Sequence, residues 1–336
     1  MKAFYLLSPA LFVCAAPVLA QVVVASPLNS GRLVSPLWLD AKSTACSSQA
    51  ISAMGYSLDN STSTTIVYAT SIAAHVNASV GTHTLHVKSW GNFGASCVTD
   101  VAITIVPSPV ASVPANATVA KEIQSWAGWS AVNDTGTGPG VSQGVMAMTS
   151  SVSLSGQARE FTTSYSNSAG ERFYITIGRD SSPKNFLYDT WIYIASPSSD
   201  IANLEMDMNE VIWNGDTVIY GVQCDGYSNT WDYTANQGSP ANYDDVWLHS
   251  GAYCNPRAWA TNIWHHVQAM YSRDSEGNVT YQSVWLDGVE QVINATVPSA
   301  FALGWGNAVL TNLQVDGLGG YGSATIYADH MTVYRW

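Results

Sequence analysis

Three acidic side chains lie close together in a segment that is otherwise apolar. Residues 203–213 read NLEMDMNEVIW and include Glu205, Asp207 and Glu210. The segment is otherwise typical of a β-strand, and strands are depleted in Asp and Glu because a half-buried, pleated surface suits these side chains badly. So many carboxyl groups on one strand indicate chemistry rather than packing.

The spacing of the three carboxyl groups determines which face of the strand each one occupies. Side chains alternate between the two faces, so Glu205 and Asp207 share a face and Glu210 points the other way in a regular strand. We expect a one-residue β-bulge between Asp207 and Glu210, because bulges re-aim side chains beside active sites. All three carboxyl groups would then line one surface.

Carboxyl groups on one surface are suited to cleaving a glycosidic bond. A retaining glycosidase places a nucleophilic carboxylate and a protonated acid about 5–5.5 Å apart. A third carboxylate between them would position the nucleophile and raise the pKa of the acid. The competing interpretations are a solvated strand face, a calcium site, and the remnant of a catalytic strand in a lectin.

Aromatic residues after the acidic strand are candidates for binding a sugar. Residues 213–264 are rich in Trp and Tyr, with polar residues between them. Aromatic rings stack on the apolar faces of sugars, and polar side chains bind the hydroxyl groups. We expect stacking by Trp213, Tyr227 and Trp231 and hydrogen bonding by Gln223 and Asp225. In the competing interpretation, the aromatic rings fill the core.

The elements that must position these residues are strands. Helical periodicity is nearly absent from residues 119–336, which contain many strand-like runs, among them ERFYITIG, LYDTWIYIA, DTVIYGVQCD, AVLTNLQVDG and ATIYADHMTVYRW. So many strands in one domain predict two packed sheets, a β-jelly roll. The whole chain is therefore expected to be all-β.

Composition changes divide the rest of the chain. Residues 1–20 combine Lys2, an apolar stretch and the small-residue site VLA, which predicts a secretory signal peptide and a secreted, extracellular protein. Residues 21–107 contain short alternating runs typical of a β-sandwich. Residues 108–118, PSPVASVPANA, predict a Pro-rich, extended connector. No segment outside the signal peptide is apolar enough to span a membrane.

The cysteines of the mature chain predict disulfides. Without Cys14, which lies in the signal peptide, the chain has Cys46, Cys97, Cys224 and Cys254. Four cysteines in an exported protein allow three pairings, and the domain division favours Cys46–Cys97 and Cys224–Cys254.

The charge of the chain limits its partners. There are 24 acidic and 12 basic residues, which gives a formal net charge of −12. This excess of negative charge argues against nucleic acid or an anionic membrane as the partner, and it also disfavours acidic polysaccharides. A neutral polysaccharide is the expected substrate. No redox cofactor is implied, and the sequence leaves the oligomeric state open.

Several segments also resemble known families. The order SPLNSGRLVSPLWLDA, GTHTLHVKSWGNFG, VAITIV resembles bacterial immunoglobulin-like domains. IWHHVQAMYSRDSEGNVTYQSVWLDGVEQ and IYADHMTVYRW resemble strands of concanavalin-like and laminin-G-like jelly rolls. These sandwiches often carry a structural calcium ion, although we find no convincing ligand spacing.

The acidic strand itself is similar to the E-x-D-x-x-E signature of glycoside hydrolase families 16 and 7. That resemblance implies an endo-acting β-1,3- or β-1,4-glucanase. Glu205 would be the nucleophile, Asp207 the assisting carboxylate and Glu210 the general acid/base.

Two other functions remain open. The fold could serve a carbohydrate-binding or adhesion protein without turnover, since jelly-roll sandwiches include lectins as well as enzymes. A polysaccharide lyase is the third candidate, in which one of the scarce cations, Arg172, Arg179 or Arg257, would bind a sugar carboxylate.

Overall fold

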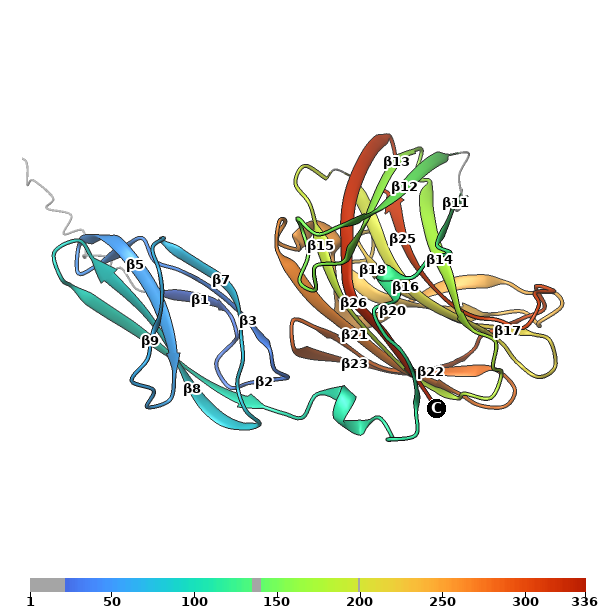
Figure 1. Cartoon of the computed structure of the whole chain (residues 1–336), viewed down its shortest axis with the longest axis horizontal. Helices are drawn as coiled ribbons and strands as arrows, with labels where there is room; N and C mark the ends of the chain where they lie inside the picture. The colour runs from blue at the N-terminus through green and yellow to red at the C-terminus, as the bar shows by residue number, and fades with distance from the viewer. Residues whose placement is uncertain (1–21, 135–139, 199) are drawn as a thin grey trace, which may run out of the picture. The chain divides into compact units, whose positions relative to one another are not determined.

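The computed structural model describes residues 22–134, 140–198 and 200–336, almost entirely as strands and turns (Figure 1). The expected signal peptide lies outside these described residues. Contacts divide the chain into two compact units: Val106–Trp336 together with Leu33–Pro36 form one, and the preceding residues through Ile105 form the other. None of the described residues belongs to a helix long and apolar enough to cross a membrane.

The first unit is built from strands in separate sheets. One sheet has the order β1-β3-β7, and the other contains β2-β9-β8-β5-β4 with β6 beside β5. The bounds are β1 Val23–Ser26, β2 Gly31–Leu33, β3 Leu37–Lys42, β4 Ala45–Cys46, β5 Gln49–Leu58, β6 Thr65–Val67, β7 Ser71–Val76, β8 Gly81–Gly91 and β9 Ser96–Ile105. A Cys46–Cys97 disulfide joins β4 to β9, which confirms that predicted pairing.

The second unit consists mainly of two large sheets. We call β11-β14-β25-β16-β18-β19-β20, with β17 and β24, the front sheet, and β12-β13-β26-β15-β21-β22-β23, with β10, the back sheet. The front strands are β11 Ser130–Asp134, β14 Gly170–Gly178, β16 Ile201–Val211, β17 Thr217–Tyr220, β18 Val222–Asp225, β19 Thr230–Asn236, β20 Asp245–Tyr253, β24 Ala300–Phe301 and β25 Val309–Gly317.

The back strands are β10 Thr118–Ala120, β12 Val141–Thr149, β13 Ala158–Ser166, β15 Asn185–Ile194, β21 Trp264–Arg273, β22 Asn278–Leu286, β23 Val289–Pro298 and β26 Tyr321–Arg335. Short 3₁₀ turns occur at Pro109–Ser112, Ile123–Ser125 and Pro256–Ala258. The first of these turns lies in the segment predicted to be an extended connector.

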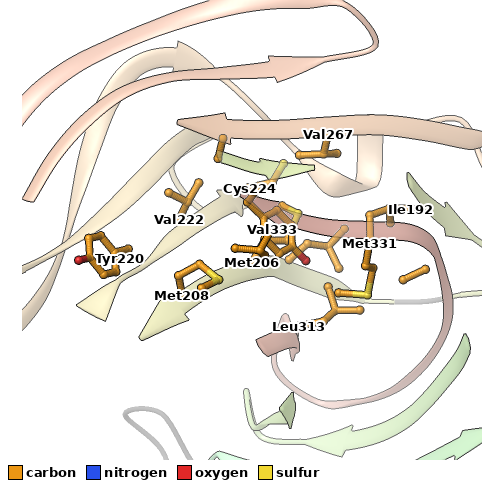
Figure 2. Packing of buried hydrophobic residues seen from close by; sticks show 14 of the residues in the cluster. Ile192, Met206, Met208, Tyr220, Val222, Cys224, Val267, Leu313, Met331 and Val333 are labelled. Atoms are coloured by element: carbon orange, nitrogen blue, oxygen red, sulfur yellow. The ribbon is translucent and has the colours of Figure 1, made fainter. Parts of the chain in front are cut away.

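The core of the second unit lies between the two sheets. Alternate residues of β16 face inward, and Met206 and Met208 are fully buried there beside Leu313 of β25. Figure 2 shows these side chains together with Val267 from the back sheet. Burying one such side chain contributes about 1.5–3 kcal/mol. The predicted all-β fold with a two-sheet second domain is confirmed, while the immunoglobulin-like assignment of the first domain stays a prediction.

Candidate functional site on the outer face of the front sheet

Strand β16 runs straight through the acidic segment. Its register with β25 pairs Glu205 with Gln314 and continues without interruption through Glu210; the one irregularity lies earlier, between Ile201 and Asn203. The predicted bulge between Asp207 and Glu210 is therefore wrong. β17 pairs with β16 from Met208 to Val211 on its other edge, so β16 is held in regular pairing on both sides there.

Glu210 consequently points into the core and not toward Glu205 and Asp207. Its side chain is fully buried and accepts hydrogen bonds from Arg273 Nε at 2.7 Å and the Tyr220 hydroxyl at 3.0 Å. Burial raises the pKa of Glu210, and Arg273 opposes that shift. Placing Glu210 beside the other two carboxyl groups was wrong, because a buried arginine supplies the partner that a buried carboxylate requires.

The outer face of the front sheet, opposite the core, carries Glu205 and Asp207 in two transverse rows of side chains. We call the first the Glu205 row; cross-strand pairing aligns Arg172, Gln314, Glu205, Gln223, Asp232 and His249. The second, the Asp207 row, contains Tyr174, Asn312, Asp207, Gly221, Thr234 and Trp247. Since neighbouring strands lie about 4.8 Å apart, each row spans roughly 24 Å.

Glu205 lies in an environment that favours its protonated form. It is 5% exposed and accepts a hydrogen bond from Gln314 Nε2 at 2.9 Å. Gln314 Nε2 also donates to Asp316 at 3.0 Å. Burial, followed by the carboxyl groups of Asp316 and Asp207, raises the pKa of Glu205 well above its ordinary value. These surroundings shift Glu205 toward its protonated form, the form that can give a proton to a ligand.

Asp207 lies in an environment that favours ionisation more. Its carboxylate accepts hydrogen bonds from the Val222 backbone N–H and from Asn312 Nδ2, each at 3.1 Å. Burial raises the pKa of Asp207 to about 7, and the two donors oppose this shift. Glu205 and Asp207 thus share a strand face but differ in proton affinity, the pattern that separates an acid from a base within one site.

The predicted sugar-binding residues have different outcomes. Gln223 and Asp225 lie on the outer face, where both are buried among its side chains. Trp231 faces the core and is fully buried, so its predicted role in sugar stacking is wrong. Trp213 and Tyr227 are exposed, but they occupy turns after β16 and β18 and do not belong to either row.

Several residues of the two rows were not assigned to this site from the sequence, and Arg172 was considered only as a cation of the lyase alternative. Arg172 and Tyr174 come from β14, Asn312 and Gln314 from β25, and Trp247 from β20. The signal for the first four was present, because ERFYITIG and TNLQVDG carry polar residues at alternate positions, as β16 does. Such alternation predicts a polar outer face on each strand.

One end of the Glu205 row has a set of side chains that could hold a cation. Ligand atoms of Asp225, Asp232 and His249 lie within 4.8 Å of one another. Asp232 is fully buried, accepts a 2.7 Å bond from His249 Nδ1, and has a pKa raised to about 6, chiefly by burial. The Cys224–Cys254 disulfide, which confirms the second predicted pairing, ties β18 to the segment following β20 beside these residues.

A second set consists of Glu122, Asp329 and His330. The buried Asp329 carboxylate already accepts bonds from the backbone N–H groups of Leu154 and Ser155.

No protein-family model and no curated protein matches the chain. Among solved structures, one from work on carbohydrate-binding modules of the β-sandwich superfamily superposes on this chain with a TM-score of 0.34 at 12% identity. The match covers 93% of this chain and 96% of that one. An alginate lyase from Chlorella virus superposes with a TM-score of 0.35 at 8% identity, and the match covers 62% of this chain and 93% of the lyase chain.

The catalytic domain of a family 131 β-glucanase from Podospora anserina gives a TM-score of 0.31 at 12% identity, covering 56% of this chain and 78% of that one. Similarities this low carry no argument about function. The function is therefore argued from the two rows of side chains alone.

Proposed function

We propose that the protein is a secreted glycoside hydrolase that cleaves a neutral β-glucan-type polysaccharide on the outer face of the front sheet. The observation that supports this proposal is the pairing of Glu205 and Asp207, two neighbouring carboxyl groups on one strand face with different proton affinities. Titratable groups with perturbed pKa values cluster at functional sites more often than elsewhere.

In this proposal Glu205 is the general acid and Asp207 the nucleophile. Glu205 gives its proton to the departing glycosidic oxygen, and Asp207 attacks the anomeric carbon to form a covalent glycosyl intermediate. Water then releases the sugar, with Glu205, now ionised, taking the proton. These assignments differ from those implied by the family resemblance, which made Glu205 the nucleophile and Glu210 the acid.

The charge of the outer face argues against the lyase alternative. The two rows carry the carboxyl groups of Glu205, Asp207 and Asp232, with Asp316 beside them, and Arg172 is the only arginine among their residues. Arg172 Nε already donates to Gln314 at 2.8 Å. A lyase must bind and neutralise a uronate carboxylate, and this face would repel such a polymer. A neutral sugar meets no such repulsion.

The test is a screen for reducing sugars released from neutral β-1,3- and β-1,4-glucans. We expect release by the native protein and a loss of at least about 100-fold in Glu205→Gln and Asp207→Asn, the contribution usual for a positioned acid or base. Glu276→Gln is the matched control, because Glu276 is exposed in the β21–β22 turn.

The screen also separates the alternatives. Binding of a glucan without any product would replace the proposal by the carbohydrate-binding function. Unsaturated products that absorb in the near ultraviolet would replace it by the lyase. Full activity in both Glu205→Gln and Asp207→Asn would rule out this face as the catalytic site.

A further inference from the structure

A gap in the side chains of the outer face lies directly beside Asp207. Gly221 occupies this place in the Asp207 row: the preceding Tyr220 pairs with Met208, and the following Val222 donates its N–H to Asp207. The side chains of Tyr220 and Val222 are buried in the core, so a side chain at position 221 would point outward. Since glycine has none, the outward space beside the proposed nucleophile is left to neighbouring side chains, and these bury Gly221.

The indole of Trp247 lies across this gap. A Cβ atom placed on Gly221 would lie 3.0 Å from Cη2 of Trp247 and 3.0 Å from Cβ of Thr234. Trp247 on β20 pairs with Thr234 on β19, so its ring reaches over β19 to Gly221, which directly precedes β18. A methyl group at position 221 would press on both Thr234 and the ring, and these neighbours would have to give by a few tenths of an ångström.

Trp247 differs from the tryptophans that stabilise the fold. It is half-buried, and within the described residues its indole N–H has no hydrogen-bond acceptor and its ring has no aromatic partner. Its Nε1 is also not among the buried unpaired atoms, so water or a ligand can reach it. By contrast, the Trp129 indole donates to the Ile123 carbonyl, and Trp231 is enclosed in the core.

We infer that Trp247, seated on Gly221, is the platform on which the sugar ring next to the cleaved bond stacks. The inference rests on the proposed function and names a specificity determinant of the same site. An indole face contacts the C–H groups of a pyranose, and the free N–H can donate to a hydroxyl at the ring's edge. Such a platform favours sugars with equatorial hydroxyls, whose ring faces are apolar, over epimers with an axial hydroxyl on the stacked face.

Kinetics on a soluble β-glucan oligosaccharide with the full-length protein test this role. We expect Trp247→Ala to raise KM by about 10-fold or more, the range for a buried aromatic anchor, with a much smaller change in kcat. Gly221→Ala should raise KM by a smaller factor although the tryptophan remains, because the added methyl shifts the ring by a few tenths of an ångström. Trp247→Phe should retain part of the affinity. Trp305→Ala, which removes a 40%-exposed tryptophan outside both rows, is the control.

The outcomes distinguish this inference from the proposed function. A KM within twofold of the native value in Trp247→Ala, while the native protein turns over substrate, would overturn the platform and leave the hydrolase intact. If neither the native protein nor any variant releases product, the hydrolase proposal fails. In that case calorimetry with the same oligosaccharide tests the platform: loss of binding in Trp247→Ala but not in Trp305→Ala supports it, and equal binding in both overturns it. Should Gly221→Ala fail to fold, the Trp247→Phe and Trp247→Ala pair decides.

Discussion

Glu205 and Asp207 illustrate how one strand can give two carboxyl groups different chemistry. Both are about 5% exposed, but Asp207 is held by two N–H donors, whereas Glu205 has one amide donor and the carboxyl group of Asp316 beside it. Burial raises both pKa values, and the neighbouring groups then decide which carboxyl keeps its proton.

The pH dependence of turnover follows from this difference. Asp207 must be ionised to attack, and its pKa is raised to about 7, so kcat/KM should increase as pH rises from about 5 to 8. Burial and the carboxyl groups of Asp316 and Asp207 raise the pKa of Glu205, which favours its protonated form toward higher pH. Initial rates across pH 4–9 (about one-unit steps suffice) check this. A profile that falls steadily from pH 5 to 8 would contradict the assignment.

The same shift predicts how Glu205 affects stability. Folding raises the pKa of Glu205. Below the unfolded-state pKa the group is protonated in both states and has no effect on the free energy of unfolding. As pH rises above that value, the unfolded chain ionises more readily than the folded protein, so the folded protein loses stability. Glu205→Gln removes that penalty. We expect the variant to match the native protein near pH 4 and to be more stable near pH 8, by at least about 1 kcal/mol. Urea unfolding at both pH values measures the difference, and destabilisation at pH 8 would refute this account.

At the scale of elements, the pair formed by Glu210 and Arg273 joins the two sheets, since Glu210 belongs to β16 and Arg273 to β21. Removing one partner leaves the other charge buried and unpaired, so Glu210→Gln should cost about 3–5 kcal/mol. The activity per folded molecule should persist, because Glu210 lies on the core side of β16.

Replacing both residues, as Glu210→Gln with Arg273→Met, should recover part of the lost stability in a denaturation experiment. A single variant as stable as the native protein would show that the pair contributes nothing.

Strand alternation explains how much of the site could be predicted. The shared face of Glu205 and Asp207 depends only on neighbours in the sequence, and the structure bears it out. The orientation of Glu210 depends on Arg273, 63 residues further along the chain, and the sequence gives no sign of that pairing. The donor to Glu205, Gln314, is 109 residues away. The local sequence pattern therefore predicts which face of the strand each carboxyl group occupies, whereas partners far along the chain determine what each carboxyl group can do.

The aromatic residues show the same limit. Trp213, Trp231 and Trp247 all lie in one aromatic-rich block of the sequence. Alternation along β19 puts Trp231 on the core face, and the pairing of Trp247 with the outward Thr234 puts Trp247 on the outer face. The order of strands, which places β20 beside β19, then lets the ring of Trp247 reach Gly221.

At the scale of the whole molecule, charge should select the polymer. With a formal net charge of −12, the protein repels anionic chains, and salt weakens that repulsion. We expect a carboxymethylated β-glucan to bind more weakly than the unmodified glucan, by about 10-fold at low salt, with the difference shrinking as ionic strength approaches roughly 1 M. Affinity electrophoresis at two salt concentrations compares the polymers. Tighter binding of the carboxymethylated chain would contradict a preference for neutral substrates.

The central claim is that Asp207 attacks and Glu205 protonates on the outer face, without Glu210. Azide rescue tests it most directly, with an activated aryl β-oligoglucoside as the substrate. Asp207→Ala with azide should yield a glycosyl azide of inverted configuration, because azide replaces the nucleophile. Glu205→Ala with azide should yield the retained configuration, because azide intercepts the covalent intermediate. A glycosyl azide of retained configuration from Asp207→Ala, or azide rescue that occurs only in Glu210→Ala, would contradict the account.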